Sequence, residues 1–164
     1  MITDDYKNEL GRICINFQAL EVHICVLTWN LIGEDQLVGR VVTSNMSFSR
    51  ICDTLIGLSK YRFGKDASAT TTIEGLVKRA SQLEQKRNTF IHSYWTTDDS
   101  SGSVGRVKFS VTRNNGLKES HPDVDVQELR EIADETAKLS KEFLKLHSEL
   151  AISVPNKLSN TNAG

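Results

Sequence analysis

A long stretch of helical periodicity, from about Asp5 to Ile32, constrains the fold more than any other feature of the sequence. At about 100° per residue, apolar side chains form one stripe along it: Leu10, Ile13, Cys14, Phe17, Leu20, Ile24, Thr28 and Leu31. A second apolar group lies on a different side of the same helix: Ile15, Val22, Val26 and Trp29. A helix that is apolar on two sides is buried on two sides. We therefore expect a homodimer through this second group and the third helix described below, the alternative being a central helix within a monomer.

Three further helices are expected after this one. The first runs from about Ser47 to Tyr61 and is stopped by Gly64, after a connection over 34–45 with room for a short turn. The next opens at Thr71 with a capping box and continues to about Trp95. The last follows a second capping arrangement at 125–128 and carries apolar residues at alternating spacings of three and four, which suits antiparallel bundle packing.

The segment between the last two helices has a different periodicity. Residues 96–105 are rich in Asp, Ser and Gly, which is typical of an exposed loop. Val107, Phe109 and Val111 then alternate with polar residues and predict a strand, and the turn signal at 114–116 favours a hairpin. The expected class is mainly all-α: an antiparallel bundle of four to five helices with a small inserted strand or hairpin. We expect one domain over 1–152 and a disordered tail over 153–164.

The charge of the chain argues against one class of protein, the non-specific nucleic-acid binders. Such proteins are usually basic, whereas these 164 residues carry a formal net charge of -1 and have a sequence pI of about 6.4. Cys14, Cys25 and Cys52 form no Cys-x-x-Cys pair and lie in apolar helical contexts, so we expect buried, reduced thiols in a cytoplasmic protein. The polar, acidic start argues against a signal peptide, and we expect no membrane span.

One arginine breaks the hydrophobic pattern of the third helix. With Ile73 as origin, Arg87 falls at about -40° and Glu84 at about +20°, both inside the apolar stripe. Glu21 interrupts the stripe of the first helix in the same way. A buried guanidinium without a partner costs several kcal/mol, so we expect Glu21 or Glu84 to pair with Arg87.

An amide and an imidazole follow this arginine closely. Asn88 and His92 are four residues apart and share a helix face, whereas Arg87 and His92 lie about 140° apart. One straight helix can hardly bring both onto the same phosphate, but two copies facing each other across a twofold axis could. The alternative is structural: His92 as a C-terminal helix cap and Arg87 in an internal ion pair.

The segment Arg87-Asn88-x-x-x-His92 resembles the R-x(4–6)-H motif of the HEPN superfamily, and the order of elements from about Asp5 to Ile152 is similar to its helical bundles. The resemblance implies a metal-independent endoribonuclease of a toxin–antitoxin or other defence system, or a non-catalytic dimerisation or ligand-binding module. It implies catalytic roles for Arg87, Asn88 and His92 only. No metal or other cofactor is expected, and the sequence does not identify a neutralising partner protein.

The chemistry that this resemblance implies uses the 2′-hydroxyl of RNA as the nucleophile. His92 would transfer the proton, since an imidazole changes its charge near neutral pH. Arg87 would hold the phosphate oxygens and Asn88 would orient the phosphate or the imidazole, giving a 2′,3′-cyclic phosphate and a 5′-hydroxyl. Glu21 and Glu84 would support the site. The inserted strand adds positive charge that could contact RNA: Arg106, Lys108 and Arg113.

Overall fold

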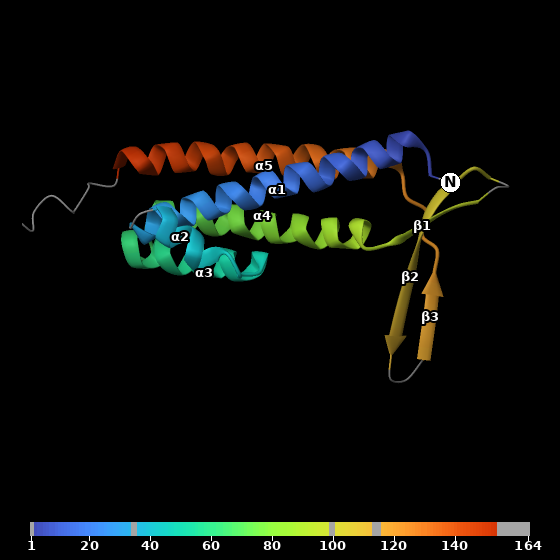
Figure 1. Cartoon of the computed structure of the whole chain (residues 1–164), viewed down its shortest axis with the longest axis horizontal. Helices are drawn as coiled ribbons and strands as arrows, with labels where there is room; N and C mark the ends of the chain where they lie inside the picture. The colour runs from blue at the N-terminus through green and yellow to red at the C-terminus, as the bar shows by residue number, and fades with distance from the viewer. Residues whose placement is uncertain (1, 34–35, 99–100, 113–115, 154–164) are drawn as a thin grey trace, which may run out of the picture. The chain divides into compact units, whose positions relative to one another are not determined.

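The computed structural model describes residues 2–33, 36–98, 101–112 and 116–153. In chain order the described elements are α1 (Asp4–Ile32), α2 (Gln36–Thr43), α3 (Phe48–Phe63), α4 (Ser68–Ile91), β1 (Tyr94–Thr97), β2 (Val104–Thr112), β3 (Gly116–Ser120) and α5 (Val126–Ser153) (Figure 1). The expected class is confirmed, because the described chain is mainly helical and has a small antiparallel sheet between α4 and α5. Beyond Ser153, the predicted tail lies outside the described residues.

The chain divides into two compact units. Unit 1 consists of Met1–Leu20 and Lys78–Leu139, and unit 2 of Glu21–Val77 and Ser140–Gly164. The helices α1, α4 and α5 are each divided between the two units, with one segment in unit 1 and one in unit 2. Unit 1 contains the whole motif from Arg87 to His92 and all three strands, so it holds the candidate site.

Helix ends within unit 2 are closed by specific hydrogen bonds. The Ser47 side chain accepts from the Arg50 amide at the start of α3, and Gly64 ends this helix with a φ of 104° that favours glycine. At the end of α1, the guanidinium of Arg62 donates to the carbonyls of Leu31 and Ile32 at 2.8 and 2.7 Å. These bonds satisfy carbonyls that a helix end leaves without partners.

The connection after α1 is an eight-residue helix rather than a short turn, and it covers part of the second apolar group of α1. The indole Nε1 of Trp29 donates to the Thr43 hydroxyl of α2 at 2.9 Å. Gly39 of α2 lies directly against this indole, so that a Cβ added there would meet Trp29 at 2.6 Å. Trp29 is therefore half-buried by its own chain, whereas Ile15 and Val22 remain 72% and 45% exposed.

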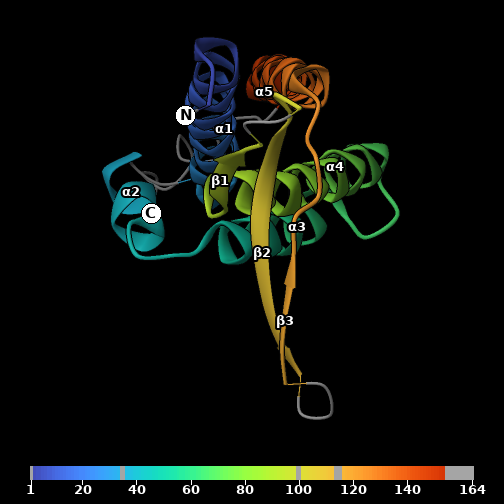
Figure 2. The same cartoon turned by 90° about the vertical axis from the view of Figure 1, so that its right-hand side faces the viewer.

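Unit 1 is built on the packed segments of α1, α4 and α5, which lie side by side (Figures 1 and 2). Buried apolar residues from all three fill its interior: Ile13, Phe17, Leu20, Ala80, Leu83, Phe90, Leu129, Ile132 and Ala133. Within this interior, the buried carboxylate of Glu9 accepts from Arg12 at 2.6 Å and from Arg130 of α5 at 3.3 Å. Arg12 also pairs with Asp134. The hydrogen bond to Asp134 is the main reason why the pKa of the Arg12 guanidinium is raised. The cluster ties α1 to α5.

The strands of unit 1 form an antiparallel sheet in the order β1-β2-β3. The first half of β2 pairs with β1, from Tyr94↔Val107 to Thr97↔Val104, and the second half pairs with β3. The far end of β2 and β3 extends away from the helices of this unit (Figures 1 and 2). Val107 is therefore buried whereas Phe109, two residues further along the strand, is 60% exposed. The turn signal at 114–115 lies outside the described residues.

Helix α4 starts and ends earlier than the sequence predicted. It begins at Ser68, since the Thr71 amide already donates to the Ala67 carbonyl, and Glu74 pairs with Lys60 instead of closing a capping box. It ends at Ile91, and Trp95 lies in β1. Residues five apart on a helix point about 140° from each other. Trp95 could therefore not stack on Phe90 if the helix continued. Because the chain leaves the helix at Ile91, the two rings stack with their centroids 6.2 Å apart.

Of two expectations from composition, that of no membrane span stays a prediction, and that of three buried thiols needs correction. An 18-residue window of α1 has a mean hydropathy of 1.4, so α1 is long and apolar enough to cross a membrane by length and composition, a test that a core helix also meets. Cys52 is buried as expected and Cys25 is half-buried, but Cys14 is exposed. Burial, together with the nearby charge of Glu21, raises the pKa of the Cys25 thiol to about 11.

We expect Glu9→Ala to lower the free energy of unfolding by about 2 kcal/mol, because it removes a buried acceptor from two charged donors. Chemical denaturation followed by circular dichroism measures the change. The matched control is Glu149→Ala, whose carboxylate is exposed and pairs with Lys145 at 3.7 Å. This control should cost less than about 0.5 kcal/mol. Equal losses in the two variants would contradict a structural role for Glu9.

Candidate functional site

Arg87 lies on α4 with its guanidinium against α1. Its Cζ sits 5.5 Å from the centre of the buried Phe17 ring, and its Nη1 donates to the Asn88 side-chain oxygen at 2.8 Å. Its Nε is buried and has no hydrogen-bond partner. Within the described part of unit 1, this guanidinium therefore contacts an aromatic ring and an amide. The arginine is half-buried, as its place in the stripe predicted.

Asn88 connects the other two residues of the motif. Its side-chain oxygen accepts from Arg87, and its main-chain carbonyl accepts from the His92 amide at 3.3 Å. An amide whose oxygen is held by a guanidinium keeps its NH₂ group as a donor for another acceptor. Since Asn88 is exposed, that donor faces solvent, where a phosphate oxygen can reach it.

His92 occupies the turn between α4 and β1, and its side chain is exposed. The turn is held at both ends by aromatic packing. Phe90 is buried, and Trp95 both stacks on it and donates from Nε1 to the Phe90 carbonyl at 3.1 Å. Tyr6 meets the Trp95 ring edge-on and donates to the Val124 carbonyl. The imidazole is therefore accessible to solvent on a turn of defined position.

The supporting residues that the sequence predicted are only partly brought together. Glu84 is half-buried on α4, and its pairing with Arg87 stays a prediction. Glu21 belongs to unit 2, and its role beside Arg87 stays a prediction. Arg106 projects from β2 toward α4, where its Cζ lies 5.5 Å from the centre of the Phe90 ring.

Two other predicted RNA contacts remain untested. The Lys108 side chain and the whole of Arg113 lie outside the described residues. Of the basic residues that the sequence singled out on the inserted strand, Arg106 is thus the one whose surroundings can be described.

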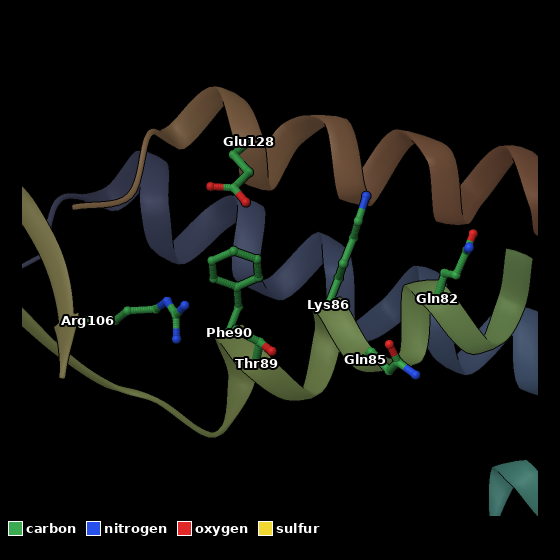
Figure 3. Close-up of a pocket in the computed structure, with 7 residues that line it drawn as sticks. All are labelled: Gln82, Gln85, Lys86, Thr89, Phe90, Arg106 and Glu128. Atoms are coloured by element: carbon green, nitrogen blue, oxygen red, sulfur yellow. The ribbon is translucent and has the colours of Figure 1, made fainter. Parts of the chain in front are cut away.

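An open pocket of about 550 Å³ lies beside the motif rather than on it. Figure 3 shows its lining, which comes from one face of α4, from β2 and from α5: Gln82, Gln85, Lys86, Thr89, Phe90, Arg106 and Glu128. Lys86 reaches from α4 toward α5, and the Glu128 carboxylate lies over the Phe90 ring. Arg87, Asn88 and His92 do not line it. The pocket therefore brings two cations, two amides, a hydroxyl and a carboxylate to the surface next to the motif.

Sequence reasoning did not find this pocket, although one signal was present. Gln82, Gln85, Lys86 and Thr89 follow helical spacing and form a polar row on α4 opposite its apolar stripe. Such a row is also typical of any solvated helix face. Glu128 lies far from this row in the sequence, and only the fold brings its carboxylate to the same surface.

Within the described residues, no group of three or more His, Cys, Asp or Glu side chains is placed to hold a metal ion. Comparisons of the chain with protein-family models, with curated proteins and with solved structures found no match. Inference about function therefore depends on the geometry of this site and on the resemblance of its motif.

We expect inorganic phosphate to stabilise the protein by binding the guanidinium of Arg87, whose Nε has no hydrogen-bond partner among the described residues. At ten times its dissociation constant, a ligand that binds only the folded state adds about 1.4 kcal/mol. Thermal unfolding at constant ionic strength, with and without phosphate, measures the effect. It should vanish in Arg87→Met and persist in Lys78→Met, which removes an exposed cation from the same helix. The same stabilisation in both variants would show that phosphate acts elsewhere.

Proposed function

We propose that the protein is a metal-independent endoribonuclease that acts as a homodimer in the cytoplasm, with a composite site of Arg87 from one protomer and His92 from the other. The observation that carries the proposal is the state of Arg87. A half-buried guanidinium whose Nε has no hydrogen-bond partner among the described residues is suited to bind an anion through its other N–H groups. Within unit 1 this guanidinium contacts an amide and an aromatic ring, and neither of these groups carries a negative charge.

The reaction follows from these groups. The 2′-hydroxyl of RNA loses its proton and attacks the adjacent phosphorus, forming the O2′–P bond. The P–O5′ bond breaks, and the departing 5′-oxygen gains a proton, which leaves a 2′,3′-cyclic phosphate and a 5′-hydroxyl. Arg87 and the NH₂ group of Asn88 stabilise the charge that builds on the non-bridging oxygens. His92, exposed on its turn, takes up or delivers a proton in this exchange.

The positions of Arg87 and His92 support a twofold arrangement. Arg87 faces Phe17 of α1, whereas His92 lies on a turn past the end of α4. On an ideal helix these positions are about 140° apart, so one protomer presents them in different directions. A second copy that supplies the missing group resolves the conflict. A defence or toxin role is the biological setting that fits this activity, and it rests on the resemblance of the motif alone.

We expect His92→Ala to lose RNA cleavage by at least about 100-fold, the usual contribution of a proton-transferring side chain. The assay is cleavage of end-labelled single-stranded RNA in EDTA, with mass spectrometry of the product ends. The matched control is His121→Ala, another exposed histidine of unit 1, which pairs with Glu119. Cleavage retained in His92→Ala would remove the histidine from the mechanism. No cleavage by the folded, dimeric wild type would favour the non-catalytic binding module.

The dimer has its own test, for which Val22 is the best position on α1. The sequence pointed to Trp29, but α2 covers this residue, and a change there would disturb unit 2. We expect Val22→Glu to dissociate the dimer at low micromolar concentration, because it places a charge in an apolar contact. Analytical ultracentrifugation measures the mass. Tyr61→Glu, at an apolar position 82% exposed on α3, is the control. If the Val22→Glu variant still forms a dimer at this concentration, another face joins the protomers.

A further inference from the structure

The open pocket beside the motif carries cationic groups that the proposed chemistry has not used. Lys86 is exposed, and its ammonium approaches the Glu135 carboxylate only at 4.0 Å. Arg106 lies against the Phe90 ring, and no described carboxylate forms an ion pair with it. A guanidinium in this position keeps its N–H donors for a ligand. Both cations border the same pocket, so this surface suits an anion.

The neutral groups of the pocket suit a ligand with hydrogen-bonding edges. The side chains of Gln82 and Gln85 each offer a donor and an acceptor, and Thr89 offers a hydroxyl. The Glu128 carboxylate, which lies over the Phe90 ring, accepts from hydroxyl or amino groups. A simple anion needs none of these groups, whereas a nucleotide has a phosphate, a ribose with hydroxyls and a base with donor and acceptor edges.

His92 lies on the same side of α4 as two residues of the pocket, just past the end of the helix. Gln85, Thr89 and His92 follow the spacing i, i+4, i+7, and the amide of His92 keeps the helical bond to the Asn88 carbonyl one residue past the end of α4. All three side chains are exposed. From Thr89 to His92 the advance along the helix is about 4.5 Å. A chain of nucleotides that places one phosphate at His92 therefore passes over the pocket.

We propose that this pocket is the subsite for the nucleotide next to the scissile bond of single-stranded RNA; the inference rests on the proposed function. Arg106 and Lys86 bind the neighbouring phosphate, and Gln82 and Gln85 bind the edge of the base. Glu128 accepts from the ribose 2′-hydroxyl, a group that DNA lacks. The substrate is single-stranded because the base edges of a paired strand are not free to enter such a pocket.

The test measures RNA binding separately from cleavage. The full chain carrying His92→Ala is titrated into a fluorescein-labelled 12-nucleotide single-stranded RNA, and anisotropy gives the affinity at several salt concentrations. Adding Arg106→Gln or Lys86→Gln should each weaken binding by 3- to 10-fold, about the effect of one lost phosphate contact, and reduce the slope of log K against log salt by about 0.7. Lys78→Gln, an exposed lysine of α4 outside the pocket, should change neither quantity.

The outcomes separate the two proposals. RNA binding that neither Arg106→Gln nor Lys86→Gln weakens overturns the subsite and leaves the nuclease proposal standing. Weakened binding in both variants, with no cleavage by the wild type, supports the pocket as a binding site for single-stranded RNA and removes both the catalytic proposal and the pocket's place next to a scissile bond. No RNA binding by the folded protein overturns both. Arg106 also packs on Phe90, so circular dichroism checks its fold, and the exposed Lys86 gives an independent result.

Discussion

The buried carboxylate of Glu9 is the interaction on which unit 1 depends. It binds Arg12 of its own helix and Arg130 of α5, and so holds the two helices that flank α4. Arg87 has different neighbours, the ring of Phe17 and the amide of Asn88. The same unit thus contains arginines that bind a buried carboxylate and an arginine that we propose to bind an anion.

The end of α4 depends on a second constraint, the return of Trp95 onto Phe90. This packing stops the helix at Ile91 and leaves His92 on an exposed turn. The same packing places β2 beside the end of α4. Arg106 of β2 then lies against the ring of Phe90 and borders the pocket. One aromatic contact therefore fixes the position of His92, to which we assign the proton transfer, and of the pocket that we assign to the substrate.

Hydrophobic periodicity was enough to predict the long helices, the inserted hairpin and the half-buried state of Arg87. It could not predict the contact between Arg87 and Asn88, because several polar groups are within reach along one helix and only three-dimensional packing decides which of them meet. It missed Glu9, which shares a row with the fully buried Ile13 but precedes the obvious apolar stripe. It also continued α4 through Trp95, since an aromatic contact that ends a helix leaves no trace in the spacing of apolar residues.

The central claim, that each site takes Arg87 from one protomer and His92 from the other, is tested most directly by complementation. Two inactive proteins, Arg87→Met and His92→Ala, are mixed under conditions in which dimers exchange subunits, and RNA cleavage is measured. In each mixed dimer, one of the two sites then has both native residues. When half of the dimers are mixed, the account therefore predicts about a quarter of wild-type activity. A mixture as inactive as its components, with exchange shown by mass, would place both residues in one protomer and contradict the composite site.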